Sequence, residues 1–204
     1  MSNNPERTAR IVLQHLHDVR NLLNSIDLEA VLLTELATDP NVVQAMGRIR
    51  RELKHLEAVE QSLMFKFTDP RPSAISSRDL LQLWQQQIAP LEDATHQIEW
   101  SETGASAVIT MDANPVLAVL RGLILNAWSH YPRPVVKAAI INTATTVILE
   151  LREAPTRPAL PPAPSADEQL LVQRNGGTLV VATDEVTLEQ VTSLRFPVTL
   201  IPTP

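Results

Sequence analysis

Residues 15–24 are His15-Leu16-His17-Asp18-Val19-Arg20-Asn21-Leu22-Leu23-Asn24, within a segment almost free of proline. Between Glu6 and Asp69 the only proline is Pro40, in the sequence Thr38-Asp39-Pro40-Asn41. Proline inside a helix removes a backbone hydrogen bond and clashes with the preceding turn. The segment therefore predicts two long helices joined by one tight turn at Pro40.

Apolar residues recur at spacings of four and three along both predicted helices, and we call these positions the apolar stripe. They are Val12, Leu16, Val19, Leu23, Ile26, Ala30, Leu33 and Ala37 on the first helix, and Val42, Met46, Ile49, Leu53, Leu56, Leu63 and Phe67 on the second. Only Glu60 interrupts the pattern. Such spacing is typical of coiled-coil-like packing. A single hairpin cannot cover both sides of this stripe, so we expect two copies to form a four-helix bundle.

A polar stripe is predicted beside the apolar one. His17 follows directly on a stripe position, and each helical residue turns by about 100°, so we expect its side chain to reach solvent. Gln14, Asn21 and Asn24 lie on the same helix face as His17. The neighbouring Asp18 could hold one imidazole nitrogen protonated and leave the other as a nucleophile. The same residue types also fit an ordinary solvated helix face, and both interpretations are open at this point.

The chain changes character after the predicted linker Asp69-Pro-Arg-Pro-Ser. We predict helices at 77–89, with Ser77 as its cap, at 115–131 and at 167–174. Strands are predicted at 97–100, 107–111, 135–141, 145–151, 178–182 and 191–200, with an irregular proline-rich connection over 155–166. Helices mixed with antiparallel strands favour a two-layer α/β sandwich. The sequence thus predicts two domains, residues 1–69 and 70–204.

The composition excludes several classes of protein. The chain of 204 residues has five glycines, without any G-x-G pair or P-loop sequence, and no cysteine. Glycine-dependent phosphate loops, disulfides, thiol catalysis and cysteine zinc sites are therefore excluded. The net charge of −6 disfavours nucleic acid binding. No histidine pair has metal-ligand spacing with a third ligand, so we expect no metal site. No signal segment or membrane-spanning run is present, so we expect a cytoplasmic protein without a membrane partner.

The sequence H-D-x-R-N-x-L, formed by His17, Asp18, Arg20, Asn21 and Leu23, resembles the phosphoacceptor box of two-component histidine kinases. The resemblance implies that His17 is the phosphorylated histidine. It further implies that Asp18 assists as acid or base and that Asn21 helps to position water for dephosphorylation.

The second domain is similar to the ATP-binding domain of the same kinases. The helix from Asp112 to Ala127 resembles the one that carries the N box, with Asn126 at the magnesium position and Gly122 where the family often has another polar residue. After the strand at 147–151, however, Arg152-Glu-Ala-Pro-Thr-Arg-Pro replaces the D-x-G-x-G motif, and a proline-rich stretch replaces the second glycine box. With neither an acid for adenine nor phosphate-binding glycines visible, we expect a degenerate ATPase-like domain.

A kinase-like scaffold without an ATP site resembles the phosphorelay histidine phosphotransferases of the sporulation and cell-cycle type. The resemblance implies reversible phosphoryl transfer between receiver-domain aspartates through His17. It implies a homodimer without a cofactor of its own, since the receiver would supply Mg²⁺. A divergent ATP-dependent histidine kinase remains an alternative. So does a non-catalytic scaffold or a phosphatase that regulates a response regulator.

Residues expected to contact the receiver are Gln14, Arg20, Asn24, Arg48 and Arg51. The last two belong to a basic segment, Arg48 to Lys54, on the second predicted helix. Such a run is ordinarily a solvated face. It could also steer an acidic receiver towards the helices.

Overall fold

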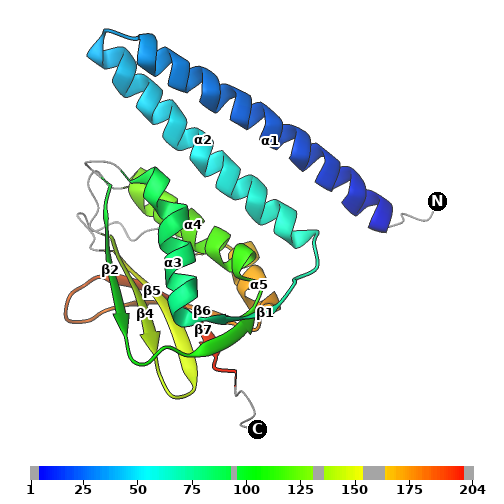
Figure 1. Ribbon diagram of the computed structural model, residues 1–204, viewed down its shortest axis with the longest axis vertical. Coiled ribbons are helices and arrows are strands. Elements are labelled where there is room, and N and C mark those ends of the chain that lie inside the picture. Colours follow the sequence, from blue (N-terminus) through cyan, green and yellow to red (C-terminus); the bar gives the residue numbers. More distant parts are fainter. Residues whose placement is uncertain (1–4, 93–95, 131–135, 154–163, 200–204) are drawn as a thin grey trace. The chain divides into compact units, whose positions relative to one another are not determined.

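The computed structural model describes residues 5–92, 96–130, 136–153 and 164–199. The chain falls into two compact units, Met1–Asp69 and Pro70–Pro204. The first unit consists of helices alone, and the second combines helices with β-sheet (Figure 1).

The first unit is an antiparallel hairpin of two long helices, α1 (Pro5–Leu36) and α2 (Pro40–Lys66). Asp39 caps α2, because its side chain accepts a hydrogen bond of 2.8 Å from the backbone N–H of Asn41. Pro40 occupies the first turn of α2, where its missing N–H costs nothing. The predicted pair of helices and the turn at Pro40 are thus confirmed.

Part of the apolar stripe packs inside the hairpin. Leu23 and Ala30 of α1 and Leu53 of α2 are buried, together with Ala58, which lies outside the stripe. Other stripe residues remain exposed in the single chain, with exposed fractions between 40 % and 52 % at Val19, Ile26, Leu33, Val42, Ile49 and Leu56. The hairpin therefore has one buried seam and one uncovered apolar face.

A five-stranded sheet forms the centre of the second unit. Its strands are β2 (Ile98–Thr103), β4 (Val136–Asn142), β5 (Thr146–Glu153), β6 (Thr178–Thr183) and β7 (Gln190–Pro197), in the spatial order β2-β4-β5-β7-β6. The β2–β4 pair is parallel, and the remaining pairs are antiparallel. A separate two-stranded antiparallel sheet joins β1 (Ser73–Ser76) to β3 (Val108–Met111).

Three helices cover one face of the five-stranded sheet: α3 (Ser77–Ile88), α4 (Ala113–His130) and α5 (Ala166–Arg174) (Figure 1). A short 3₁₀ helix (Ala89–Leu91) follows α3. The core between helices and sheet consists of fully buried apolar side chains, among them Leu80, Trp84, Ile88, Leu120, Ile124, Ile140, Leu149 and Leu151. The predicted mixture of helices and strands is confirmed, with two differences: β1 was not predicted, and the β2–β4 pair is parallel.

Two local predictions were wrong. Ser76, not Ser77, caps α3, and its hydroxyl accepts a hydrogen bond of 3.1 Å from the backbone N–H of Asp79. Ser77 is instead fully buried, and its hydroxyl accepts a hydrogen bond of 3.2 Å from the N–H of Ala107. The predicted linker also ends early, because β1 begins at Ser73. Most of the predicted irregular connection, residues 155–163, lies outside the described part of the chain.

Candidate functional site

His17 lies in the middle of α1 and projects into solvent, with 65 % of its side chain exposed. Asn21, one turn later on the same helix, places its Nδ2 atom 3.3 Å from His17 Nδ1. Asp18 Oδ1 is 3.7 Å from the same ring nitrogen and also accepts a hydrogen bond of 3.2 Å from Gln14 Nε2. Four of the predicted site residues therefore form one connected polar group around an exposed imidazole.

The position of the ring proton decides which imidazole nitrogen of His17 is available as a nucleophile. If the Asn21 amide donates to Nδ1, the ring proton lies on Nε2, and Nε2 has no free lone pair. If Nδ1 carries the proton instead, it needs an acceptor, which the Asp18 carboxylate or the rotated Asn21 amide supplies. The second arrangement leaves a free lone pair on Nε2. Asp18 and Asn21 are thus the two side chains that lie beside His17 Nδ1, the atom on which the tautomer depends.

Other side chains share the helix face of His17. Asn24 is exposed, and towards the hairpin turn this face continues with Leu28 and Leu32, which are 62 % and 49 % exposed. The helical period puts Leu28 about 20° and Leu32 about 60° from His17 around the helix axis. Sequence reasoning missed these two leucines because they lie outside the apolar stripe.

The predicted partner contacts separate into two groups. Arg48 and Arg51 are exposed on α2. Arg20 instead contacts its own hairpin, where its guanidinium donates hydrogen bonds of 3.1 Å and 2.6 Å to Glu60 Oε2 and one of 2.9 Å to Glu60 Oε1. Arg20 therefore has a structural partner within the chain, and its predicted role as a receiver contact stays a prediction.

In the second unit, α4 and α5 meet at Gly122. A Cβ atom on Gly122 would lie 3.8 Å from Oε1 of Glu168, in the first turn of α5. Glu168 also completes a capping box: its Oε2 accepts a hydrogen bond of 2.6 Å from the Ser165 N–H, and its own N–H donates one of 3.2 Å to Ser165 Oγ. The start of α5 thus already has a carboxylate at the place where a helix would hold an anion.

One acidic residue was overlooked in the sequence. Glu153 is the last residue of β5 and the second residue of the stretch that replaces the D-x-G-x-G motif, and it is 6 % exposed. It alternates with Leu149 and Leu151, so it lies on the sheet face that the helices cover. In the sequence it is the first acidic residue after the predicted strand at 145–151, but neither the aspartate nor the glycines of the motif accompany it.

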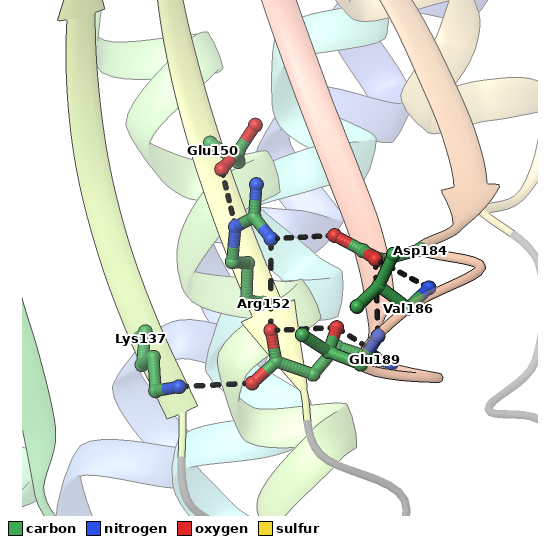
Figure 2. Close-up of polar contacts among 7 residues, drawn as sticks. Lys137, Glu150, Arg152, Asp184, Val186 and Glu189 are labelled. Atoms are coloured by element: carbon green, nitrogen blue, oxygen red, sulfur yellow. Dashed lines mark hydrogen bonds and ion pairs between the residues drawn. The ribbon is translucent and has the colours of Figure 1, made fainter.

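A cluster of charged residues joins the ends of β4 and β5 to the connection between β6 and β7 (Figure 2). Lys137 Nζ is 2.9 Å from Glu189 Oε1, and Arg152 donates hydrogen bonds to Glu150 Oε1 at 2.7 Å and to Asp184 Oδ2 at 3.1 Å. The hydrogen bond from Lys137 lowers the pKa of Glu189, and Glu189 in turn raises the pKa of Lys137. Sequence reasoning gave no indication of this cluster.

Comparison with solved structures identifies the fold class as that of histidine kinases. The chain is similar to the Acinetobacter baumannii histidine kinase AdeS, with a TM-score of 0.54 and 13 % identity over 90 % of this chain and 98 % of that one. It is also similar to histidine kinase ThkA, solved in complex with the response regulator protein TrrA (TM-score 0.56, 15 % identity, 95 % of this chain and 61 % of that one). Full-length ShkA, in complex with AMPPNP, gives a TM-score of 0.54 at 15 % identity over 95 % of this chain and 47 % of that one.

The comparisons by sequence found no match, either among family models or among curated proteins. The chain therefore has a histidine-kinase-like fold. None of the helices in the described part of the chain combines the length and hydrophobicity needed to cross a bilayer.

Proposed function

We propose that this protein is a histidine phosphotransferase that passes a phosphoryl group between receiver-domain aspartates through His17. The observation that carries the proposal is the exposed imidazole, 65 % accessible, with its Nδ1 atom next to Asn21 and Asp18. An acceptor for the Nδ1 proton is what turns Nε2 into a nucleophile at neutral pH.

The His17 imidazole and a receiver aspartyl phosphate account for every bond that forms or breaks in the proposed transfer step. The Nε2 lone pair attacks the phosphorus of a receiver aspartyl phosphate, the bond from phosphorus to the aspartyl oxygen breaks, and a carboxylate leaves. The imidazole ring keeps its Nδ1 proton, and Asp18 stabilises the positive charge that develops on the ring. The reverse step returns the phosphoryl group to another receiver aspartate. The receiver would bring the Mg²⁺ ion, and alignment of the two groups would supply most of the rate.

The start of α5 supports transfer without ATP. A nucleotide phosphate held at this helix start would compete with Glu168, whose carboxylate already accepts the Ser165 N–H at 2.6 Å. Both the phosphate and Glu168 are anionic, so the first turn of α5 does not fit a phosphate group. We accordingly derive no catalytic step through ATP.

We further propose that the protein acts as a homodimer through the uncovered apolar face of the hairpin. A second hairpin placed on Val19, Ile26, Ile49 and Leu56 would bury side chains that are now 41–51 % exposed. Burying apolar side chains of this kind contributes about 1 kcal/mol or more each, so a four-helix bundle is the favourable closed arrangement. The face with His17, Leu28 and Leu32 lies on another side of α1 and remains open to a receiver.

Phosphotransfer profiling tests the proposal. Receiver domains of the host are phosphorylated with a labelled small-molecule donor, freed of that donor and mixed with the full chain. We expect label on the wild type and none on His17→Gln. His15→Gln, which removes an exposed histidine two residues away on the same helix, serves as the matched control and should accept label normally. The linkage should be labile in acid and stable in base, as a phosphoramidate is. Equal labelling of His17→Gln would refute the proposal.

One observation favours a second candidate, an ATP-dependent histidine kinase with a divergent site. Glu153 offers a buried carboxylate at the end of β5, where a carboxylate could accept a hydrogen bond from an adenine amino group. Calorimetry with Mg-ATP separates the two candidates. Tight binding that is lost in Glu153→Ala would support the kinase, and an absence of heat at millimolar ATP would support transfer without nucleotide.

A further inference from the structure

Strand β6 lies at one edge of the five-stranded sheet, and in the described part of the chain only β7 pairs with it. Its six residues, 178–183, are Thr-Leu-Val-Val-Ala-Thr, and all of them except Leu179 are exposed. Val180 and Val181 are each 38 % exposed. We call the unpaired side of this strand the β6 edge.

The β6 edge lacks two features by which proteins protect an edge strand from further pairing. Charged side chains and proline are common means of such protection. Strand β2, at the opposite edge of the sheet, carries two charged residues, Glu99 and Glu102. Strand β6 contains neither a charged residue nor a proline. Its apolar and β-branched residues instead favour the addition of another strand.

The hydrogen bonds to β7 decide which backbone groups of β6 point towards its open edge. The N–H of Asp184, directly after β6, donates 2.8 Å to the carbonyl of Glu189, directly before β7. In an antiparallel pair, residues that bond to the partner strand alternate with residues that point away from it. Counted back from Asp184, three residues of β6 therefore direct their N–H and C=O groups to the open edge: Leu179, Val181 and Thr183.

A second copy of β6 that runs antiparallel to the first can pair all three of these residues in one register. This register sets Val181 opposite Val181 of the partner subunit and Leu179 opposite the partner's Thr183. Moving the register by two residues one way sets Thr183 opposite the partner's Gly177, which lies outside the strand. Moving it the other way sets Leu179 opposite the partner's Glu185, also outside the strand. A two-fold axis at Val181 therefore satisfies the strand's own open edge.

The charges near the two ends of β6 favour the same pairing. Arg195 of β7 is exposed and lies opposite Thr178, at the start of β6, and Glu185 is exposed just after its end. Within the described residues, neither Arg195 nor Glu185 has an ion-pair partner. Antiparallel pairing brings the start of one β6 beside the end of the other. The basic end of each copy therefore meets the acidic end of its partner.

We propose that the β6 edge binds a second copy of this chain strand to strand and joins two five-stranded sheets into one. All residues of this contact belong to the second unit, so it is separate from the hairpin seam and independent of His17. An edge of six residues makes a small interface, so we expect a dissociation constant between about 10 μM and about 1 mM. A hairpin dimer would carry two such edges, so the contact would link dimers into larger assemblies.

Sedimentation velocity of the full chain over a concentration series tests the contact. The mean mass of the wild type should rise with concentration up to about 1 mM. Val181→Lys sets two like charges opposite each other at the axis and should raise the dissociation constant about tenfold or more. Leu83→Lys is the matched control, because Leu83 is a 39 % exposed residue of α3 in the same unit, and it should associate as the wild type does.

An exchange of charges separates pairing from folding. Glu185→Arg and Arg195→Glu should each weaken the association, and the double variant should recover most of it, which a general loss of structure would not do. Tryptophan fluorescence during urea unfolding checks the fold of each variant, because Trp84, Trp100 and Trp128 all belong to the second unit.

Ile26→Glu distinguishes the β6 edge from the proposed hairpin seam. In this variant the mass should rise from one chain to two and no further, because a two-fold contact closes on itself. Labelling of His17 at low protein concentration should be the same in Val181→Lys as in the wild type, so a failure of phosphotransfer leaves this test intact. A wild-type mass that stays constant up to about 1 mM, or Val181→Lys that associates as the wild type does, would overturn the proposal.

Discussion

Arg20 of α1 and Glu60 of α2 form a paired contact across the helical hairpin, with the two shortest nitrogen–oxygen distances at 2.6 Å and 2.9 Å. Glu60 is only 4 % exposed, and its position is the one polar interruption of the apolar stripe. A buried carboxylate is tolerated only when its charge is matched. Arg20 follows His17 by three residues, so this pair fixes the part of the hairpin that carries the imidazole.

We predict that Arg20→Ala destabilises the hairpin by about 3 kcal/mol, because it leaves the Glu60 carboxylate buried without its partner. The double variant Arg20→Leu with Glu60→Leu should recover most of the loss, since it restores an apolar residue to the stripe. The measurement is urea unfolding followed by helical circular dichroism at one protein concentration. A double variant as unstable as Arg20→Ala would contradict this explanation of Glu60.

A second stability prediction concerns the turn after α5. A Cβ atom on Gly177 would overlap the ring of Phe196, a buried residue of β7, whereas nothing lies near the corresponding position of Gly176. Gly177→Ala should therefore cost about 1–3 kcal/mol through overpacking. Gly176 has a φ of 76°, so Gly176→Asn, which tolerates that conformation, should cost less. Tryptophan fluorescence during urea unfolding measures the stability of both variants. Equal losses of stability would exclude the overlap with the Phe196 ring as the cause.

The sequence predicted an element correctly where the residues that determine it lie close together in the chain. The stripe from Val12 to Phe67 predicted α1 and α2 because a helix repeats one local geometry over many residues. Strand β1 escaped prediction, since its four residues follow Pro70 and Pro72 and gain their partner only from β3, more than thirty residues later. The contact between Lys137 and Glu189 was equally hidden, because 52 residues separate the two in the sequence. The polar stripe of His17 could be predicted, but the pairing of Arg20 with Glu60 could not.

Acid should weaken the hairpin through Asp27. Burial alone would raise the pKa of Asp27, but the hydrogen bond from Arg50 and the charge of Lys54 outweigh burial, so the pKa is lowered. A carboxyl whose folded pKa lies below its unfolded value of about 3.9 stabilises the fold above that pH. This contribution to stability is lost as the pH falls through the pKa that Asp27 has in the folded protein. We expect the urea midpoint of the wild type to drop more steeply below about pH 4 than that of Asp27→Asn. Glu29→Gln, which removes an exposed carboxyl of the same helix, should keep the wild-type slope.

The tautomer of His17 gives a prediction for the proposed transfer. Asn21→Asp places acceptor oxygens beside Nδ1 and should favour the Nδ1–H form, which frees Nε2. Asp18→Asn removes the carboxylate 3.7 Å from Nδ1 and should slow transfer to His17 by about 10²-fold. Nitrogen-15 chemical shifts of the imidazole report the tautomer directly. If Asp18→Asn slowed transfer to His17 but left the tautomer of the imidazole unchanged, Asp18 would act in a way other than through the tautomer.

The two exposed apolar faces of α1 should separate dimerisation from transfer. Ile26 belongs to the apolar stripe and is 45 % exposed, whereas Leu28 shares the face of His17 and is 62 % exposed. Ile26→Glu puts a charge into the proposed dimer seam and should shift the protein towards monomer in sedimentation velocity. Leu28→Glu should leave the dimer intact and raise the KM for the phosphorylated receiver, because it disturbs a surface that only the receiver would cover. Each variant is the control for the other, since both change one exposed aliphatic residue of the same helix to glutamate. If Leu28→Glu dissociated the dimer, or if Ile26→Glu remained dimeric, the assignment of the two faces would have to be exchanged.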